Sequence, residues 1–574
     1  QVARGSNSTL ISFIRGVGQQ DPLWGFEPGV GLYIDDVYVA RPQGAVLDIF
    51  DIQRIEVLRG PQGTLFGKNA SAGLVNIVSK GGTDSLEAEA RAEYYEGDEY
   101  RLRGSLSGPI ATDLSARLTG FYGSYDGNIT NVFGGREDQI NGYEHYGARG
   151  IVDYDGPMAR LRFIADYFRA DDDCCADITT VSRGAVLDAE LGLPGGVAQG
   201  LDQRYVNHNL VTQTKDRQWS LTANADIDLT DTHTLSVVTG YRNWKNREFR
   251  EGDFLPRAIV GTNELHDEGL VTTQQMSFEA RIASDAAMPF FYQVGAFAWH
   301  SDNKQVFTRE DVVCNSSTLP LAPSGARPCN LSDTVNTIFP TATSYSDVGS
   351  TNVAVFGQAT YRFSDFISLT GGLRYTWDDL TYIHTRAPGV NATNGAPATG
   401  PGISGSGAGG SIASGGNGTN TSSGQSSNGN LSGKAVLQIT PSDDVMLYGS
   451  YTRGYKGPAF NVFFNHTAPT NAIPIDEETS DAFEIGAKTQ FFDNRVQLNV
   501  AGFMVEYDGF QANNFVLLNG AVVSNLTNAG TVKSQGFEVD LQAVPVDGLT
   551  LRASAAYADA TVKEFNPNPQ TNAP

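Results

Sequence analysis

The sequence predicts an all-β membrane protein, in which a large antiparallel transmembrane β-barrel follows a small mixed α/β unit at the N-terminal end. Three observations support this fold class. From residue 86 onward, apolar and polar residues alternate in long segments, as they do in half-buried strands. Short and long links alternate between these segments. The first 85 residues lack both patterns and contain short apolar runs and glycine-rich turns instead.

The segment 549–557 illustrates the alternation. Its odd-numbered residues are Leu, Leu, Ala, Ala and Tyr, and the residues between them include Thr550, Arg552 and Ser554. One face of such a strand is apolar and the other is polar. Because a soluble β-sandwich has the same alternation, this pattern alone does not distinguish the two folds.

The links between the segments favour the barrel. Tight links such as 155–157 and 364–366 alternate with long polar stretches such as 171–216 and 308–350. An up-and-down transmembrane barrel has short periplasmic turns and long extracellular loops, whereas a sandwich does not need all its long loops at one end. The segments are also longer than the strands of soluble sheets and match a tilted bilayer crossing.

We count about seventeen such segments between residues 86 and 562, whereas bacterial single-chain barrels have an even number of strands. The odd count predicts that closing strands are missing. The stretch 389–430 is dominated by Gly, Ser, Asn, Thr and Ala, so we expect it to be a disordered extracellular loop.

Composition excludes two other classes. The chain has 574 residues, with 40 Lys and Arg against 64 Asp and Glu, so its net charge is −24. No basic cluster is present, which argues against a nucleic-acid partner. No apolar run reaches the length of a transmembrane helix. The mean hydropathy of −0.25 would suit a soluble protein, but a barrel disperses its apolar band among alternating polar residues.

The four cysteines fall in two pairs, the adjacent Cys174 and Cys175, and Cys314 with Cys329 around a polar stretch. We favour a Cys314–Cys329 disulfide, and Cys174 and Cys175 pair either with each other or elsewhere. An even, sparse count is typical of an oxidising compartment, although four reduced thiols are the alternative. No C-x-x-C occurs and the seven His are scattered, so no metal site is predicted.

The first 85 residues predict a small globular unit joined directly to the barrel. A strand pair around an acidic turn is expected at 30–39, and a short helix leading into a strand at 49–59. Gly67-Lys68 resembles part of a nucleotide-binding P-loop. However, the preceding glycine is four residues back instead of five, and Asn69 replaces the required Ser or Thr, so nucleotide binding is not expected.

The whole chain resembles the TonB-dependent outer-membrane receptors. The plug-domain motifs of that family match Ile14-Arg15-Gly16 and the stretches 33–38, 55–67 and 69–80, and its late-barrel signatures resemble 454–457, 483–488, 528–530 and 536–538. The resemblance implies a plug domain at 1–85 inside a receptor barrel at 86–574. Plugged barrels of this kind have 22 strands. The missing parts would then be the TonB box, the early plug and the last barrel strands.

The resemblance also implies a location and partners. It places the chain in the bacterial outer membrane, in contact with lipid and lipopolysaccharide, as a monomer that works with the inner-membrane TonB–ExbB–ExbD complex. It implies transport without covalent chemistry, so no enzyme activity and no catalytic residue are expected. The default ligand is a ferric siderophore complex, with iron carried inside the ligand and no covalently bound cofactor. Saccharides, cobalamin, haem and aromatic compounds are alternatives.

Strand parity predicts a contact between plug and barrel. Because Phe483, Ile485 and Phe537 face lipid in this reading, Glu484 and Glu538 face the lumen. Buried carboxylates need partners, and the plug supplies Arg15 and Arg59. The resemblance implies that plug arginines and barrel glutamates form a lock, so we predict that Arg59, together with Arg15, pairs with Glu484 and Glu538. The alternative is that the glutamates line a wet cavity.

The outward-facing turns of the plug are the candidate ligand site. They combine aromatic surface with hydrogen-bond donors, the mixture expected of a selective small-molecule site. The candidate residues are Gln19, Gln20, Trp24, Tyr38, Arg41 and Gln43. Ordinary turn residues are the alternative for each of them.

Two other function classes fit less well. A passive porin or an adhesin has no use for a plug in its lumen. A secreted β-rich enzyme does not explain the regular links, and no nucleophile–base cluster can be placed in the sequence.

Overall fold

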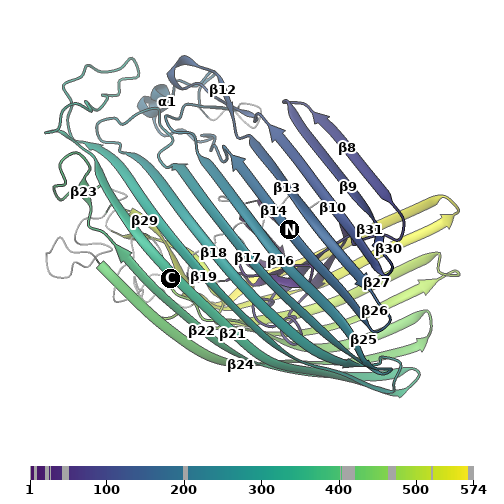
Figure 1. The fold of residues 1–574 in the computed structure, drawn as a ribbon. Helices are drawn as coiled ribbons and strands as arrows, with labels where there is room; N and C mark the ends of the chain where they lie inside the picture. Colours follow the sequence, from purple (N-terminus) through teal and green to yellow (C-terminus); the bar gives the residue numbers. More distant parts are fainter. Residues whose placement is uncertain are drawn as a thin grey trace.

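A computed structural model describes the chain except for residues 1, 5–8, 20–24, 26, 42–50, 198–203, 401–402, 404–419, 463, 465–472, 519–520 and 566–574. Its main feature is a barrel of antiparallel strands that follow one another in sequence order (Figure 1). Seventeen of these strands are long, as the alternation predicts. They are β8 (Glu87–Tyr95), β9 (Glu99–Ala111), β10 (Leu114–Tyr125), β13 (Tyr143–Asp155), β14 (Ala159–Asp172), β16 (Gln213–Thr230), β17 (His233–Glu251), β18 (Glu264–Ser284), β19 (Phe290–Cys314), β21 (Pro340–Ser364), β22 (Ile367–Arg386), β24 (Asn420–Ser442), β25 (Val445–Lys456), β26 (Glu478–Phe491), β27 (Val496–Asp508), β30 (Gly530–Val546) and β31 (Leu549–Phe565).

Strand β22 shows how the alternation is used. Leu373 and Trp377 on its outer face are 62% and 49% exposed, whereas Arg374 and Asp378 on its inner face are almost completely buried. The barrel is therefore polar inside and apolar outside, which explains the low mean hydropathy of the chain. Among the described residues, no helix has the length and apolar character needed to cross a membrane.

The two ends of the barrel differ. Tight turns close one end, where residues such as Asp113 and Asn494 adopt positive φ. The long links gather at the other end (Figure 1). They contain helix α1 (Ala185–Leu191), the hairpin β28 (Gln511–Leu518) and β29 (Ala521–Asn528), and a small sheet of β11 (Ile129–Asn131), β12 (Asp138–Ile140) and β15 (Tyr205–Val206).

Both cysteine pairs are disulfides in the structure. Cys314 at the end of β19 bonds to Cys329, with their Cα atoms 5.9 Å apart. Cys174 and Cys175 bond to each other. Short strands also extend the long-link end of the barrel, namely β20 (Thr337–Ile338) beside β19 and β23 (Val390–Asn391) beside β21.

The expectation of a disordered loop at 389–430 is wrong for the described part of that stretch. β23 lies at its beginning, and β24 already starts at Asn420 and pairs with β22 from Arg386 onward. The neighbouring strand supplies the backbone hydrogen bonds, so these polar residues form a strand that their composition does not reveal. Residues 401–402 and 404–419 lie outside the described part.

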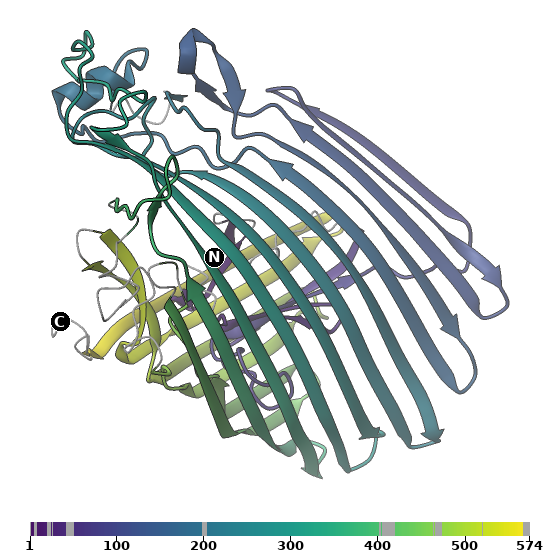
Figure 2. The ribbon, with the colours of Figure 1, turned by 60° about the vertical axis from the view of Figure 1, so that its left-hand side comes forward.

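The N-terminal residues form two small sheets inside the barrel (Figure 2). One is β1 (Val2–Arg4), β2 (Leu10–Ile14) and β3 (Val17–Gln19). The other has the order β5-β4-β7-β6, from β4 (Val30–Ile34), β5 (Val37–Val39), β6 (Ile52–Arg59) and β7 (Gly73–Ser79). The strand pair predicted at 30–39 is present as β4 and β5, and the strand predicted to end at Arg59 is β6. Most of the short helix expected ahead of β6 lies outside the described residues.

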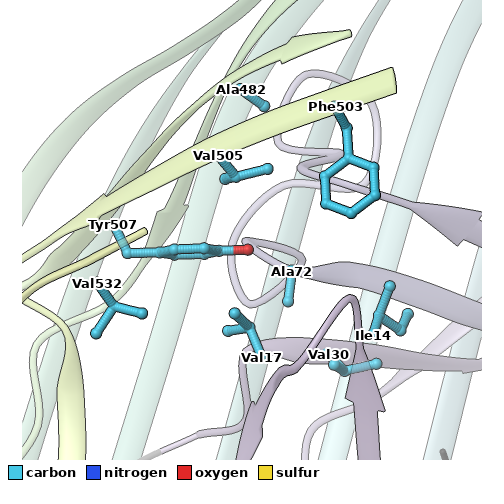
Figure 3. Packing of buried hydrophobic residues seen from close by; sticks show 9 residues of the cluster. All are labelled: Ile14, Val17, Val30, Ala72, Ala482, Phe503, Val505, Tyr507 and Val532. Atoms are coloured by element: carbon cyan, nitrogen blue, oxygen red, sulfur yellow. The ribbon is translucent and has the colours of Figure 1, made fainter. Parts of the chain in front are cut away.

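The inner unit packs directly on the barrel wall. Ile14, Val17, Val30 and Ala72 share one apolar cluster with barrel residues (Figure 3). The barrel side consists of Ala482, Phe503, Val505, Tyr507 and Val532. Because of this packing, the face of the N-terminal unit that carries Arg15 lies against strands β26, β27 and β30.

Candidate functional site

A first group of charged residues joins the inner unit to the barrel around Arg15, which lies in the turn between β2 and β3. Its Nη2 atom is 2.8 Å from Glu484 Oε2 and 2.9 Å from Glu538 Oε2, and its Nε donates to Glu538 Oε1 at 3.2 Å. We call this group the Arg15 cluster. Its members are Arg15, Arg59, Tyr448, Glu484 and Glu538.

The surroundings of Arg15 stabilise its charge. Its guanidinium lies 4.0 Å from the centre of the Phe503 ring, a cation–π contact, and Tyr448 donates to Glu484 at 2.7 Å. Burial alone would lower the pKa of Arg15, but Glu538 and Glu484 outweigh it and raise that pKa. The arrangement holds a permanent cation between two carboxylates from strands β26 and β30.

Arg59 has a smaller part than the sequence suggested. Its Nη1 atom is 3.0 Å from Glu538 and 3.8 Å from Asp540, and its side chain is 43% exposed. The predicted ion pairs are thus made mainly by Arg15, which bridges both glutamates. Arg15 occupies a left-handed turn pressed against the barrel, whereas Arg59 ends a strand whose outer face is open.

A second group lies around Lys68, in the segment between β6 and β7. Lys68 Nζ is 3.0 Å from Glu27 of the inner unit and 2.9 Å from Asp378 of β22. Asp378 also accepts hydrogen bonds from Asn352 and Tyr455, both at 2.7 Å. We call this group the Lys68 cluster. Its members are Glu27, Lys68, Asn69, Ser350, Asn352, Asp378 and Tyr455.

The Lys68 cluster has less room for water beside it than the Arg15 cluster, although the two cations are about equally buried. Lys68 is 8% exposed and Asp378 3%, and the cavity beside them has a volume of about 20 Å³, enough for about one water. Asn69 donates from its side chain to Glu27 and from its backbone to Tyr455 O at 3.0 Å. Burial by itself would lower the pKa of Lys68, but the negative charges of Asp378 and Glu27 have the larger effect and raise that pKa.

The sequence did not predict this second cluster, because Lys68 was considered only as a phosphate ligand. One local signal was present. Gly67 and Asn69 on either side of Lys68 both adopt positive φ, the conformation that Gly and Asn tolerate best. A Cβ on Gly67 would also lie 2.7 Å from the Arg374 guanidinium. The turn therefore aims the lysine at the barrel wall.

The predicted ligand residues have different outcomes. Tyr38 is buried between the inner unit and the barrel, because its ring packs on Trp299 and its hydroxyl accepts from Asn69 at 2.9 Å. It is a contact of the interface and not an open ligand surface. Arg41 is also buried and lines the small cavity of the Lys68 cluster, where burial lowers its pKa to about 10. Gln19 ends β3, and Gln20, Trp24 and Gln43 lie outside the described residues.

Comparison with known families explains this architecture. Residues 2–74 match the TonB-dependent Receptor Plug Domain, and residues 195–574 match the family described as TonB dependent receptor-like, beta-barrel. The chain belongs to the TonB-dependent receptors. These are receptors of the bacterial outer membrane, so the N-terminal unit is the plug and the strands form the membrane barrel.

Individual relatives of this receptor support the same placement. It is 25% identical over 554 residues to the pesticin receptor of Yersinia enterocolitica, covering 93% of this chain and 67% of the relative. The crystal structure of the ferric yersiniabactin uptake receptor FyuA from Yersinia pestis superposes with a TM-score of 0.73 at 18% identity, over 99% of this chain and 75% of that one. The siderophore receptor PiuA from Acinetobacter baumannii gives 0.65 at 16% identity, over 100% and 76%.

The outer end of the receptor's lumen carries a group that the sequence did not single out. Arg309 of β19 and Arg386 of β22 lie 5.3 Å and 4.7 Å from the ring centre of Phe464, and Phe307 packs against the same ring. Arg309 is held by Asp267 at 2.7 Å. The pair of cations around aromatic rings suits anionic or aromatic groups.

Among the described residues, one group of three side chains has the composition of a metal site, formed by Glu251 at the end of β17, Asp253 in the following loop and His266 in β18. Both of its carboxylates accept hydrogen bonds from backbone amides. Glu251 accepts from the amides of Asp253 and Phe254 at 3.1 Å, and Asp253 accepts from Leu255 and Leu265. Burial and the neighbouring Glu251 raise the pKa of Asp253 to about 8. These bonds shape the loop between β17 and β18.

Proposed function

We propose that this receptor imports a ferric siderophore complex across the outer membrane, in a step energised by TonB with ExbB and ExbD. The protein itself supplies binding and a gated path, and the iron travels as part of the ligand. The plug closes the lumen until the energised step moves it. The arrangement of the plug inside the barrel carries this proposal.

The key observation is how the plug is attached. Within the described residues, neither plug sheet shares a hydrogen-bonded ladder with the barrel sheet. The two parts meet through apolar packing, through side-chain pairs such as Arg15 with Glu484 and Glu538, and through single backbone hydrogen bonds such as that from the Asn69 amide to the Tyr455 carbonyl. Contacts of this kind can be broken one by one and reformed, so the plug can move without unfolding the barrel.

The Arg15 cluster is suited to act as the releasable lock. It borders a cavity of about 200 Å³ that is also lined by Lys434, Tyr448 and Glu484. Water in this cavity would solvate the carboxylates once Arg15 leaves, which lowers the cost of separating the charges. The lock therefore stabilises the closed state and still permits opening.

The choice of ligand rests on the relatives and on the outer lumen. Two of the similar proteins are named for iron or siderophore uptake, namely the ferric yersiniabactin uptake receptor FyuA and the siderophore receptor PiuA. The cationic and aromatic residues Arg309, Arg386 and Phe464 suit an anionic chelate with aromatic groups. Saccharides and cobalamin fit this surface less well, and a passive porin does not explain the packed plug.

Uptake by whole cells tests the proposal. Cells that lack their own siderophore receptors would express this receptor and receive radiolabelled iron as ferric yersiniabactin or ferric enterobactin. We expect uptake that requires TonB and stops when a protonophore collapses the proton gradient. Uptake that persists without TonB would instead support a passive pore, and TonB-dependent uptake of labelled cobalamin but not of either iron complex would contradict the ligand class.

A further inference from the structure

The outward segment of the plug consists of the described residues Gly25 and 27–29. It is tied to a loop of the barrel through backbone atoms. The amide of Phe460, in the loop after β25, donates to the carbonyl of Gly25 at 2.8 Å. A side chain on Gly25 would overlap the Phe460 carbonyl, so only glycine permits this approach. Two residues later, Glu27 turns into the barrel and meets Lys68.

Glu27 connects this outward segment to the Lys68 cluster. Its carboxylate accepts from Asn69 and from Ser350 of β21, the latter at 3.3 Å, in addition to pairing with Lys68. Lys68 in turn pairs with Asp378 and lies 4.8 Å from the centre of the Trp299 ring. A continuous path of contacts thus runs from Phe460 through Gly25 and Glu27 to Lys68 and strand β22.

We propose that Lys68 is a positioning residue for ligand reception: by clamping Glu27 to Asp378, it holds the outward segment around Gly25 in the position in which the receptor captures its ligand. The inference rests on the proposed uptake function. Lys68 acts through Glu27 and does not itself touch the ligand.

The geometry separates this role from that of the Arg15 cluster. Among the described residues, Arg15 pairs with Glu484 on β26 and Glu538 on β30, with Phe503 and Ser534 beside them. The Lys68 cluster contains a residue of the outward segment and is anchored mainly on β21 and β22. Strand β25 contributes to both clusters, with Tyr455 beside Asp378 and Tyr448 beside Glu484. Loss of Lys68 should therefore loosen Gly25 together with the plug attachment at β21 and β22, whereas loss of Arg15 should loosen only the attachment at β26 and β30.

Hydrogen exchange on the ligand-free receptor in detergent tests the clamp directly. In Lys68→Met and in Asp378→Asn, we expect the Phe460 amide to exchange at least about tenfold faster than in the unchanged receptor, because local opening of the outward segment becomes easier. Lys68→Arg should retain slow exchange. Lys80→Met is the matched control, because Lys80 is a plug lysine that is 44% exposed and pairs with Asp51 instead of the Lys68 cluster. It should leave exchange at Phe460 unchanged.

Uptake kinetics with ferric yersiniabactin as the probe give the second measurement. Lys68→Met should raise the KM of uptake at least about tenfold while the maximal rate per folded receptor stays within about twofold, because reception and not the energised step is affected. A purely structural role would lower the amount of folded receptor and leave KM unchanged.

The possible outcomes separate the inference from the proposed function. Unchanged Phe460 exchange in both Lys68→Met and Asp378→Asn would overturn the inference, as would equal acceleration throughout the plug. Should Lys68→Met fail to fold, Asp378→Asn and Lys68→Arg still decide the matter. Faster exchange in a receptor that takes up neither iron complex would contradict the proposed function and leave the clamp standing.

Discussion

The Arg15 and Lys68 clusters both join the plug to the barrel by ion pairs, but their surroundings differ. Each places one plug cation between two carboxylates. Arg15 lies beside a cavity of about 200 Å³, and one partner, Glu484, is 23% exposed. Lys68 lies beside a cavity of about 20 Å³, and its partner Asp378 is 3% exposed.

Two ion-pair clusters with the same charges can therefore differ in the free energy needed to separate those charges. When a buried pair is broken, the remaining charges lose their partner, and the cost depends on how well water can replace it. Water can reach the carboxylates around Arg15, whereas the packing around Lys68 leaves room for little. We therefore expect the plug to separate more readily at Arg15 than at Lys68, and the following predictions test that order.

The largest effect is expected for Lys68→Met. The substitution leaves Asp378 buried and Glu27 half-buried without their cation, which should lower the free energy of opening the plug–barrel contact at this cluster by about 3–5 kcal/mol. Urea titration of the purified receptor, with protease sensitivity of the plug as the signal, measures this change. Lys80→Met is the control, and a loss for Lys68→Met as small as that of the control would contradict the dry character of the cluster.

A smaller loss is expected for Arg15→Met, about 2 kcal/mol in the same titration, since water and Arg59 partly compensate for the missing guanidinium. Arg15→Met combined with Glu484→Gln and Glu538→Gln should recover part of the loss, because the unpaired carboxylates are removed as well. A loss larger than that of Lys68→Met would reverse the proposed order of the two clusters.

The turns that carry the two cations provide a matched glycine pair. Gly67 has φ of 82° and a Cβ there would meet the Arg374 guanidinium at 2.7 Å, whereas Gly16 has φ of 79° and would meet only Ala560 at 3.0 Å. Both Gly→Ala substitutions carry the strain of a left-handed residue, about 1–2 kcal/mol. Gly67→Ala should cost more than Gly16→Ala in thermal unfolding of the plug, and equal losses would show that Arg374 adjusts freely.

The smallest effect is expected for Arg59→Ala. The side chain is 43% exposed, so its pair with Glu538 should contribute no more than about 1 kcal/mol and should weaken as salt is added. The urea titration at low and high salt measures it. A salt-independent loss would mean that Arg59 is as deeply involved in the cluster as Arg15.

Strand parity together with the family resemblance predicted the arginine–glutamate pairs of one of the two clusters. The alternation in 483–491 and 537–541 turned Glu484 and Glu538 into the lumen, and the plug motif supplied Arg15 and Arg59 as partners. The sequence could not predict that Arg15 pairs with both glutamates whereas Arg59 pairs only with Glu538 of the two. This difference depends on the turn at Arg15, which brings its guanidinium within reach of both strands.

The other cluster was hidden because its members are far apart in the chain. Glu27, Lys68 and Asp378 come from two plug segments and a barrel strand, and no local periodicity relates them. For the same reason Tyr38 was read as part of an open turn, although packing against Trp299 buries it. Strand β24 likewise extends into a Gly- and Ser-rich stretch only because β22 lies beside it.

Side-chain periodicity and motif spacing are local properties of a chain, so the barrel, the lumen-facing side of each strand and the family could be predicted from the sequence. Which plug cation meets which carboxylate, and how much water surrounds each pair, depends on the tertiary structure. The ion pairs depend on the spatial distance between residues hundreds of positions apart in the chain, and the water depends on the volume left between two packed surfaces. Neither quantity can be predicted from a single segment of the sequence.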